Sequence, residues 1–185
     1  MFLNTPGITV VAPSDPFTAK ALLKSANRSQ NPVLFFEHKN LYKMGGMIGD
    51  ENTFLPLGKA FVSGNGKDLL AIGYSHAMVT LRNATEDIKD RITYIDLATI
   101  NPLDRETILS YAEKFDKIIV VEDTPALGSV GDSVISLITQ NMNVKFPPVL
   151  IAARPLPIPF ARELEREVVP TVEIVRDRVE LLLSL

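Results

Sequence analysis

The sequence of 185 residues contains no cysteine. This absence excludes disulfides, thiolate nucleophiles and cysteine-ligated metal sites, and it favours an intracellular protein. Histidine is scarce as well, since the chain has only His38 and His76. Because these two residues stand in different segments and no Asp or Glu spacing repeats, we expect no metal site.

Long apolar runs and clusters of positive charge are also missing. The longest apolar stretches, such as 118–121 and 149–153, are far shorter than the roughly 20 residues of a membrane-spanning helix. The 19 lysines and arginines are mixed with 22 acidic residues, so nucleic acid is not an expected partner. Residues 1–11 lack the basic start of a signal peptide, and their abrupt beginning suggests a truncated chain.

The apolar pattern alternates between short strands and helices. We expect strands at residues 8–12, 33–36, 59–63, 67–74, 92–97, 117–122 and 149–152. We expect helices at about 16–28, 76–88, 105–115, 132–141 and 172–183. Ser14 or Asp15 is expected to cap the first helix, and Asp104 the third. The order predicts a β-α-β unit followed by an α/β domain with a mostly parallel sheet.

Two glycine-rich segments mark connections. Residues 41–57 show little periodicity and include three glycines, which is typical of a linker between domains. Gly64-Asn65-Gly66 contains an Asn-Gly pair, which favours a tight hairpin joining 59–63 to 67–74. We therefore expect one antiparallel edge strand.

One segment has the pattern of a catalytic motif. Gly73-Tyr74-Ser75-His76-Ala77 lies where a strand passes into a helix, as in the nucleophile elbow of α/β-hydrolases. Those enzymes need a histidine after the nucleophile in chain order, whereas His76 is adjacent to the serine and His38 lies upstream. We therefore reject a hydrolase and interpret Ser75 as a helix cap.

Two further glycine motifs offer weak evidence for anion binding. Gly64-Asn65-Gly66-Lys67 lacks the spacing of a phosphate-binding P-loop, and Asp68 follows the lysine. Gly128-Ser129-Val130-Gly131 precedes a helix and either presents amides to an anion or allows close packing of helix on strand; we favour packing.

A polar triplet, Glu37-His38-Lys39, ends the second expected strand. Strand ends in α/β proteins often face ligands, but a salt-bridged junction between domains has the same pattern, and we favour the junction. The residues alone thus give no complete active site, with no catalytic, cofactor-binding or metal-binding residue assigned.

An ordered set of segments carries a family resemblance. The segments are Thr5-Pro6-Gly7, Val10 to Pro16, Ala19 to Leu23, Asn31 to Lys39, Leu41-Tyr42, Pro56 to Ala60, Asp96-Leu97, Pro102 to Asp104, Thr107-Ile108, Pro157 to Phe160 and Leu164-Glu165. Together they resemble the C-terminal part of the β subunit of the E1 component of pyruvate and branched-chain 2-oxo-acid dehydrogenases. The resemblance covers nearly the whole chain.

The resemblance implies three parts. Residues 1–40 match the tail of a pyrimidine-binding domain, 41–57 a linker, and 58–185 a three-layer transketolase C-terminal-like domain. The family binds thiamine diphosphate and Mg²⁺ between subunits. Its pyrimidine-activating carboxylate and its histidine-containing substrate loop lie upstream of the segment matching Met1. No cofactor is therefore expected on this chain alone, which we expect to be inactive.

The resemblance also implies partners. The full-length subunit would oxidatively decarboxylate a 2-oxo acid and pass the acyl group to lipoyl E2, in an oligomer with an E1 α subunit and a second β subunit. Asp123 matches an acidic position that docks the E2 subunit-binding domain, and the carboxylate of Leu185 is expected to add to that surface. The implied location is the cytoplasm, or the mitochondrial matrix in a eukaryote.

Two alternatives stay open. The chain could be a free-standing assembly or docking module of transketolase-like fold without catalysis. It could also be a fragment of a transketolase or deoxyxylulose-phosphate synthase relative. The sequence directly upstream of Met1 distinguishes them, because an in-frame pyrimidine-domain carboxylate and histidine loop indicate an enzyme.

Overall fold

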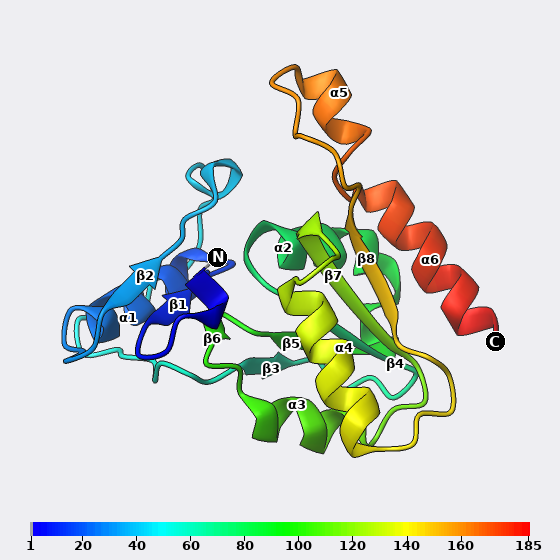
Figure 1. The fold of residues 1–185 in the computed structure, drawn as a ribbon, viewed down its shortest axis with the longest axis horizontal. Helices are drawn as coiled ribbons and strands as arrows, with labels where there is room; N and C mark the ends of the chain where they lie inside the picture. The colour runs from blue at the N-terminus through cyan, green and yellow to red at the C-terminus, as the bar shows by residue number, and fades with distance from the viewer. Residues whose placement is uncertain (1) are drawn as a thin grey trace.

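The main body is a five-stranded sheet in the order β3-β5-β4-β7-β8, seen in a computed structural model that describes residues 2–185 (Figure 1). Neighbouring strands are parallel except for β3, which pairs antiparallel with β5 at one edge. The strands are β3 (Phe61–Ser63), β4 (Leu69–Gly73), β5 (Ile92–Asp96), β7 (Ile118–Pro125) and β8 (Val149–Ala153). The expected mostly parallel sheet with one antiparallel edge strand is confirmed.

Helices cover both faces of this sheet. Leu69 and Ala71 of β4 pack with α2 (Ser75–Ala84) and α6 (Val172–Ser184). Leu70 and Ile72, on the opposite face of the strand, pack with α3 (Arg105–Ala112) and α4 (Val130–Asn141). All four side chains are fully buried, as expected for a central parallel strand covered on both sides. The three-layer architecture is therefore confirmed.

A smaller sheet lies beside the main body (Figure 1). β1 (Thr9–Val11) and β2 (Val33–Phe35) are parallel and are joined by α1 (Pro16–Ala26), which confirms the β-α-β unit. β6 (Thr99–Asn101) adds to β1 as an antiparallel strand. We did not predict β6, because three residues are too few to show the alternation of apolar and polar side chains that indicates a strand. It joins the N-terminal unit to the segment that follows β5.

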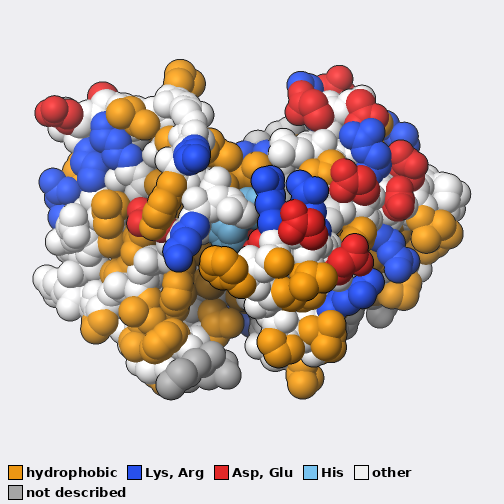
Figure 2. All heavy atoms as spheres, turned by 90° about the horizontal axis from the view of Figure 1, so that it is seen from above, with side chains coloured by type: hydrophobic (Ala, Val, Ile, Leu, Met, Phe, Trp, Pro, Cys, Tyr) orange, Lys and Arg blue, Asp and Glu red, His pale blue; other side chains and the backbone are white. Residues whose placement is uncertain are grey.

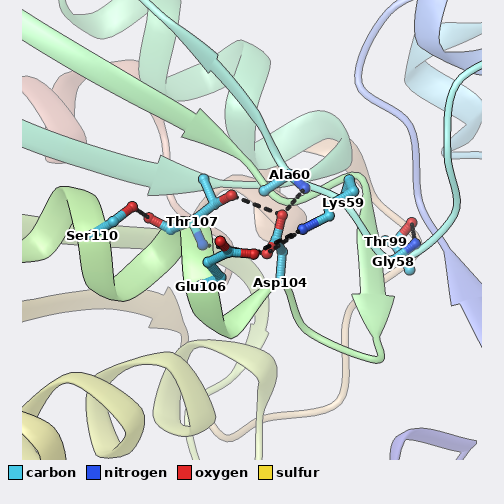
Figure 3. A network of polar contacts seen from close by, with 8 residues as sticks. All are labelled: Gly58, Lys59, Ala60, Thr99, Asp104, Glu106, Thr107 and Ser110. Carbon is cyan, nitrogen blue, oxygen red and sulfur yellow. Dashed lines mark hydrogen bonds and ion pairs between the residues drawn. The ribbon is translucent and has the colours of Figure 1, made fainter.

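Two helix caps agree with the sequence. Asp15 accepts a hydrogen bond from the Thr18 amide and forms a capping box at α1, while Asp104 accepts from the Thr107 amide at α3. Figure 3 shows that Asp104 also accepts from the Ala60 amide at 3.1 Å and lies 3.5 Å from the Lys59 ammonium. Asp104 therefore fixes the chain that enters β3 against the start of α3.

The predicted hairpin is wrong. β3 and β4 are not neighbours, because β5 lies between them in the sheet. Gly64 has φ +78°, and the loop after it runs along the start of β5, where the Asp68 amide donates to the Arg91 carbonyl at 3.0 Å. A Cβ on Gly66 would lie 1.9 Å from the Arg91 carbonyl carbon, so close approach of two backbones requires this glycine.

Several short elements differ from the expectation. The helix predicted at 76–88 ends at Ala84 and is followed by the 3₁₀ segment η3 (Glu86–Arg91). The proline-rich crossing leads into α5 (Arg162–Arg166), which we did not predict and which stands away from the body (Figure 1). The remaining 3₁₀ segments are η1 (Phe2–Asn4) and η2 (Lys39–Leu41). Within residues 2–185, every helix is too short or too polar to cross a bilayer.

Candidate functional site

The carboxyl ends of β4 and β7 meet at a point where the chain direction changes. β4 leads through α2 to β5 on one side, whereas β7 leads through α4 to β8 on the other. The two helices lie on opposite faces of the sheet. In open α/β sheets, such a switch point leaves a crevice that commonly receives ligands. This crevice is therefore the candidate ligand site.

Three polar side chains meet in this crevice. Nδ1 of His76, in the first turn of α2, lies 3.1 Å from Oδ2 of Asp123 on β7. Nε2 of His38, which follows β2, lies 4.0 Å from the same oxygen. The two imidazole rings stack, with centroids 4.6 Å apart and planes inclined by 12°. We expected no metal site because the histidines stand in different segments and no Asp or Glu spacing repeats; the fold brings these segments together beside Asp123.

The pKa values of the two imidazoles are shifted in opposite directions. The hydrogen bond to Asp123 raises the pKa of His76, although burial opposes the shift. Burial lowers the pKa of His38, and repulsion from His76 lowers it further. The surroundings therefore stabilise the charged form of His76 more than that of His38. The triplet Glu37-His38-Lys39 lies at a junction between the two sheets, as we favoured, and His38 makes the contact.

Ser75 begins α2 in a left-handed backbone conformation, with φ 51°. The N-cap of the helix is Tyr74, and the Ser75 side chain makes no capping bond, so the expected cap is wrong. The His76 ring contacts Asp123, and no hydrogen bond joins Ser75 to either imidazole within residues 2–185. This geometry gives no activated serine nucleophile.

Two cavities open on either side of the cluster. One of about 450 Å³ is mostly apolar and has no lysine or arginine in its lining; its lining includes Phe36, Tyr74, Ile100, Leu127 and Val130. The other, of about 590 Å³, is lined by both histidines, by Asp123, and by charged residues of the α5 region that include Arg162, Glu165 and Arg166. Figure 2 shows histidine side chains between the two lobes, so solvent reaches the cluster.

Glu122 is a buried carboxyl group that no sequence motif indicated. It is fully buried, and its Oε2 accepts from the Gly131 amide at 3.0 Å and the Tyr74 hydroxyl at 3.3 Å. Burial raises its pKa. A Cβ on Gly131 would lie 2.8 Å from the Glu122 carboxylate and 2.5 Å from Leu150. Gly131 thus allows close packing of α4 against β7. Its amide already donates to the Glu122 carboxylate and is not free to bind an external anion.

The two residues predicted to bind a partner lie at opposite ends of β7. Asp123 is near its carboxyl end, with 21% of its side chain exposed, and contacts the histidines. Leu185 follows α6, and the neighbouring Leu183 carbonyl accepts from Lys117, which precedes β7. Leu185 is 66% exposed. The fold does not bring the two predicted residues together.

Comparison with known proteins places the fold. A solved structure described as a split-gene transketolase, inactive β4 tetramer, superposes with a TM-score of 0.79 at 18% identity, covering 100% of this chain and 60% of that one. At this identity the likeness establishes the fold alone. It confirms the transketolase-like α/β architecture.

Sequence relatives are more specific. The chain is 36% identical to the 2-oxoisovalerate dehydrogenase subunit beta of Bacillus subtilis (strain 168), covering 90% of this chain and 53% of that protein. It is 34% identical to the pyruvate dehydrogenase E1 component subunit beta of Chlorokybus atmophyticus, covering 94% and 54%. The resemblance to E1 β subunits is thereby confirmed, and the chain spans about half the length of these relatives.

The family "Transketolase, C-terminal domain" matches residues 58–175. This range contains the whole five-stranded sheet with α2, α3 and α4, and two of the three crevice residues, His76 and Asp123. The match begins directly before the segment that Asp104 holds at Ala60. The chain therefore belongs to the transketolase C-terminal domain family.

Proposed function

We propose that this chain is the C-terminal part of the β subunit of a 2-oxo-acid dehydrogenase E1 component, where it serves assembly and docking rather than chemistry. The likeness to such β subunits along almost the entire chain carries this proposal. The full-length subunit would take part in oxidative decarboxylation of a 2-oxo acid, with acyl transfer to a lipoyl E2. The same likeness supports a division into a pyrimidine-domain tail at 1–40, a linker at 41–57 and a transketolase C-terminal-like domain at 58–185.

The mostly apolar cavity of the crevice does not fit thiamine diphosphate. A diphosphate needs cations around it, but no lysine or arginine lines the mostly apolar cavity, and the carboxylates of Glu37 and Asp123 do. The amide of Gly131 at the start of α4 already donates to Glu122. These residues support our expectation that thiamine diphosphate and Mg²⁺ belong to the full assembly and not to this chain alone.

An exposed apolar arm supports the assembly role. The proline-rich crossing and α5 carry Leu156, Ile158, Phe160 and Leu164, whose exposed fractions are 53%, 55%, 107% and 57%. Burying one such side chain contributes roughly 1.5–3 kcal/mol. A subunit that covers the arm would therefore bind with a favourable free energy from these four side chains. We propose that it contacts an E1 α subunit or a second β subunit.

Docking of the E2 subunit-binding domain is the second proposed role. Leu185 is exposed and accessible to a partner, whereas Asp123 would first have to break its contact with His76. Charge pairs of this kind guide association more than they fix its strength. Unchanged affinity of Asp123→Ala for an E2 binding domain would remove Asp123 from this role.

The main test has two arms. Calorimetric titration of this chain with thiamine diphosphate and Mg²⁺ should show no binding, and micromolar affinity would overturn the non-catalytic role. Mixing the chain with an E1 α subunit should give a complex on size exclusion, which Phe160→Ser with Leu164→Ser should weaken. If the double variant assembled normally, the arm would not be the interface.

Reading the gene upstream of Met1 tests the alternatives. An in-frame pyrimidine-domain carboxylate and histidine loop would support the E1 β proposal. Translation that starts at Met1 would favour a free-standing module. Transketolase activity of the full-length protein, without 2-oxo-acid dehydrogenase activity, would favour the third possibility.

A further inference from the structure

We propose that His38, His76 and Asp123 form a binding site for a divalent transition-metal ion of the Zn²⁺ type, which ties the N-terminal β-α-β unit to the transketolase domain. The three side chains offer ligand atoms that all lie within 4.8 Å of one another. Two imidazoles and one carboxylate suit Zn²⁺ and similar ions, and they leave coordination positions open.

The distances are close to those that a metal requires. Ligands that each lie about 2.1 Å from a tetrahedral ion stand about 3.4 Å apart. Nδ1 of His76 and Oδ2 of Asp123 are 3.1 Å apart, so they need almost no movement. Nε2 of His38 is 4.0 Å from the same oxygen, about 0.6 Å beyond this spacing. Its ring must also turn out of the stack on His76, because an imidazole holds an ion in its own plane and the two planes are inclined by only 12°.

Asp123 has spare binding capacity. Its Oδ1 is buried and has no hydrogen-bond partner. A buried, unpaired carboxylate oxygen is costly, and a bound cation or its water ligand would satisfy it. The cavities of about 450 Å³ and about 590 Å³ on either side give an ion access and leave room for water ligands.

Binding would change the protonation of both rings. Nδ1 of His76 would exchange its proton for the ion. Nδ1 of His38 now accepts a hydrogen bond of 3.3 Å from the Asn40 amide. Coordination through Nε2 of His38 places the proton on Nδ1, so this long hydrogen bond would be lost. We therefore expect proton release and a local change at η2 on metal binding.

The site would add a link between two parts of the chain that already meet through the pairing of β1 with β6 and the bond from Ser14 to Asp96. His38 follows β2 in the small sheet, whereas His76 and Asp123 lie at the ends of β4 and β7. An ion held by both parts would fix their relative position. This clamp is independent of any subunit partner, so it can be tested on the chain alone.

The experiment is a zinc titration of the untagged, chelator-treated chain by calorimetry at neutral pH. We expect one ion per chain, with release of protons that depends on the buffer. His38→Gln, His76→Gln and Asp123→Asn should each weaken binding at least about tenfold. Because these are the only histidines and cysteine is absent, no other strong zinc ligand competes.

Asp90→Asn is the matched control, because Asp90 is exposed at the end of η3 and lies outside the cluster. Its zinc affinity should equal that of the unmodified chain. Circular dichroism checks that each variant is folded, and visible absorption of Co²⁺ reports the nitrogen and oxygen ligands directly. The proposal is overturned by an absence of saturable binding, or by binding that all three ligand variants retain.

Discussion

The hydroxyl of Ser14 donates a hydrogen bond to Oδ2 of Asp96, and this buried contact joins the β1–α1 connection to the end of β5. Both residues are almost completely buried, at 0% and 1% exposure. The Ala98 amide donates to the other carboxylate oxygen at 3.2 Å. Burial raises the pKa of Asp96 to about 6, although the Ser14 hydrogen bond opposes the shift.

This raised pKa makes stability depend on pH. The folded state holds the Asp96 proton more tightly than the unfolded chain, so the stabilisation is present below about pH 4 and is lost as pH rises through about 6. Asp96→Asn cannot titrate. The unfolding free energy of the variant minus that of the unmodified chain should therefore increase by roughly 3 kcal/mol at most between pH 4 and pH 7. Urea unfolding across this range measures it, and parallel profiles would contradict the assignment.

The buried carboxylate of Asp104 should contribute to stability. Burial opposes its ionisation, but hydrogen bonds from Thr107 and Ala60 outweigh burial and lower its pKa. Asp104→Ala leaves buried donors unpaired and should reduce the unfolding free energy by about 2–3 kcal/mol, measured in urea at neutral pH. Glu106→Ala is the control. Glu106 also pairs with Lys59 but is 86% exposed, so its loss should cost less than about 0.5 kcal/mol.

Gly66 should not tolerate a side chain. A Cβ there would lie 1.9 Å from the backbone at Arg91 and Ile92, and the start of β5 cannot retreat without disturbing its pairing in the sheet. Gly66→Ala should therefore reduce the unfolding free energy by about 3 kcal/mol, measured in thermal or urea unfolding. Gly45→Ala, where nothing lies within 4 Å, should change stability little. Equal effects of the two substitutions would show that the close approach is wrong.

Ser75 should be replaceable by glycine. Its left-handed φ of 51° costs an ordinary residue about 1 kcal/mol, and its side chain makes no capping bond. Ser75→Gly should leave the unfolding free energy unchanged or raise it by about 1 kcal/mol. Ala77→Gly, inside the same helix, should lower it by about 1 kcal/mol or more. Marked destabilisation by Ser75→Gly would mean that the hydroxyl has a partner.

Local sequence determined most of the regular elements and the starts of α1 and α3. Asp15 and Asp104 cap their helices through neighbouring amides, and the apolar periods of α6 and the buried run of β4 are complete within a few residues. These interactions span three or four positions, so they can be read without knowing the fold. The strand and helix order then limited the topology to a mostly parallel sheet with helices on both faces.

The tertiary structure alone decided the strand neighbours and the candidate site. The Asn-Gly pair after Gly64 favours a hairpin locally, but burial of β4 on both faces places β5 between the two strands. The stacking of His38 on His76 beside Asp123 depends on three segments that converge only after the small sheet docks against the main one. Sequence by itself identified the family and the framework, while long-range packing created the cluster, because no local pattern relates residues that meet through folding alone.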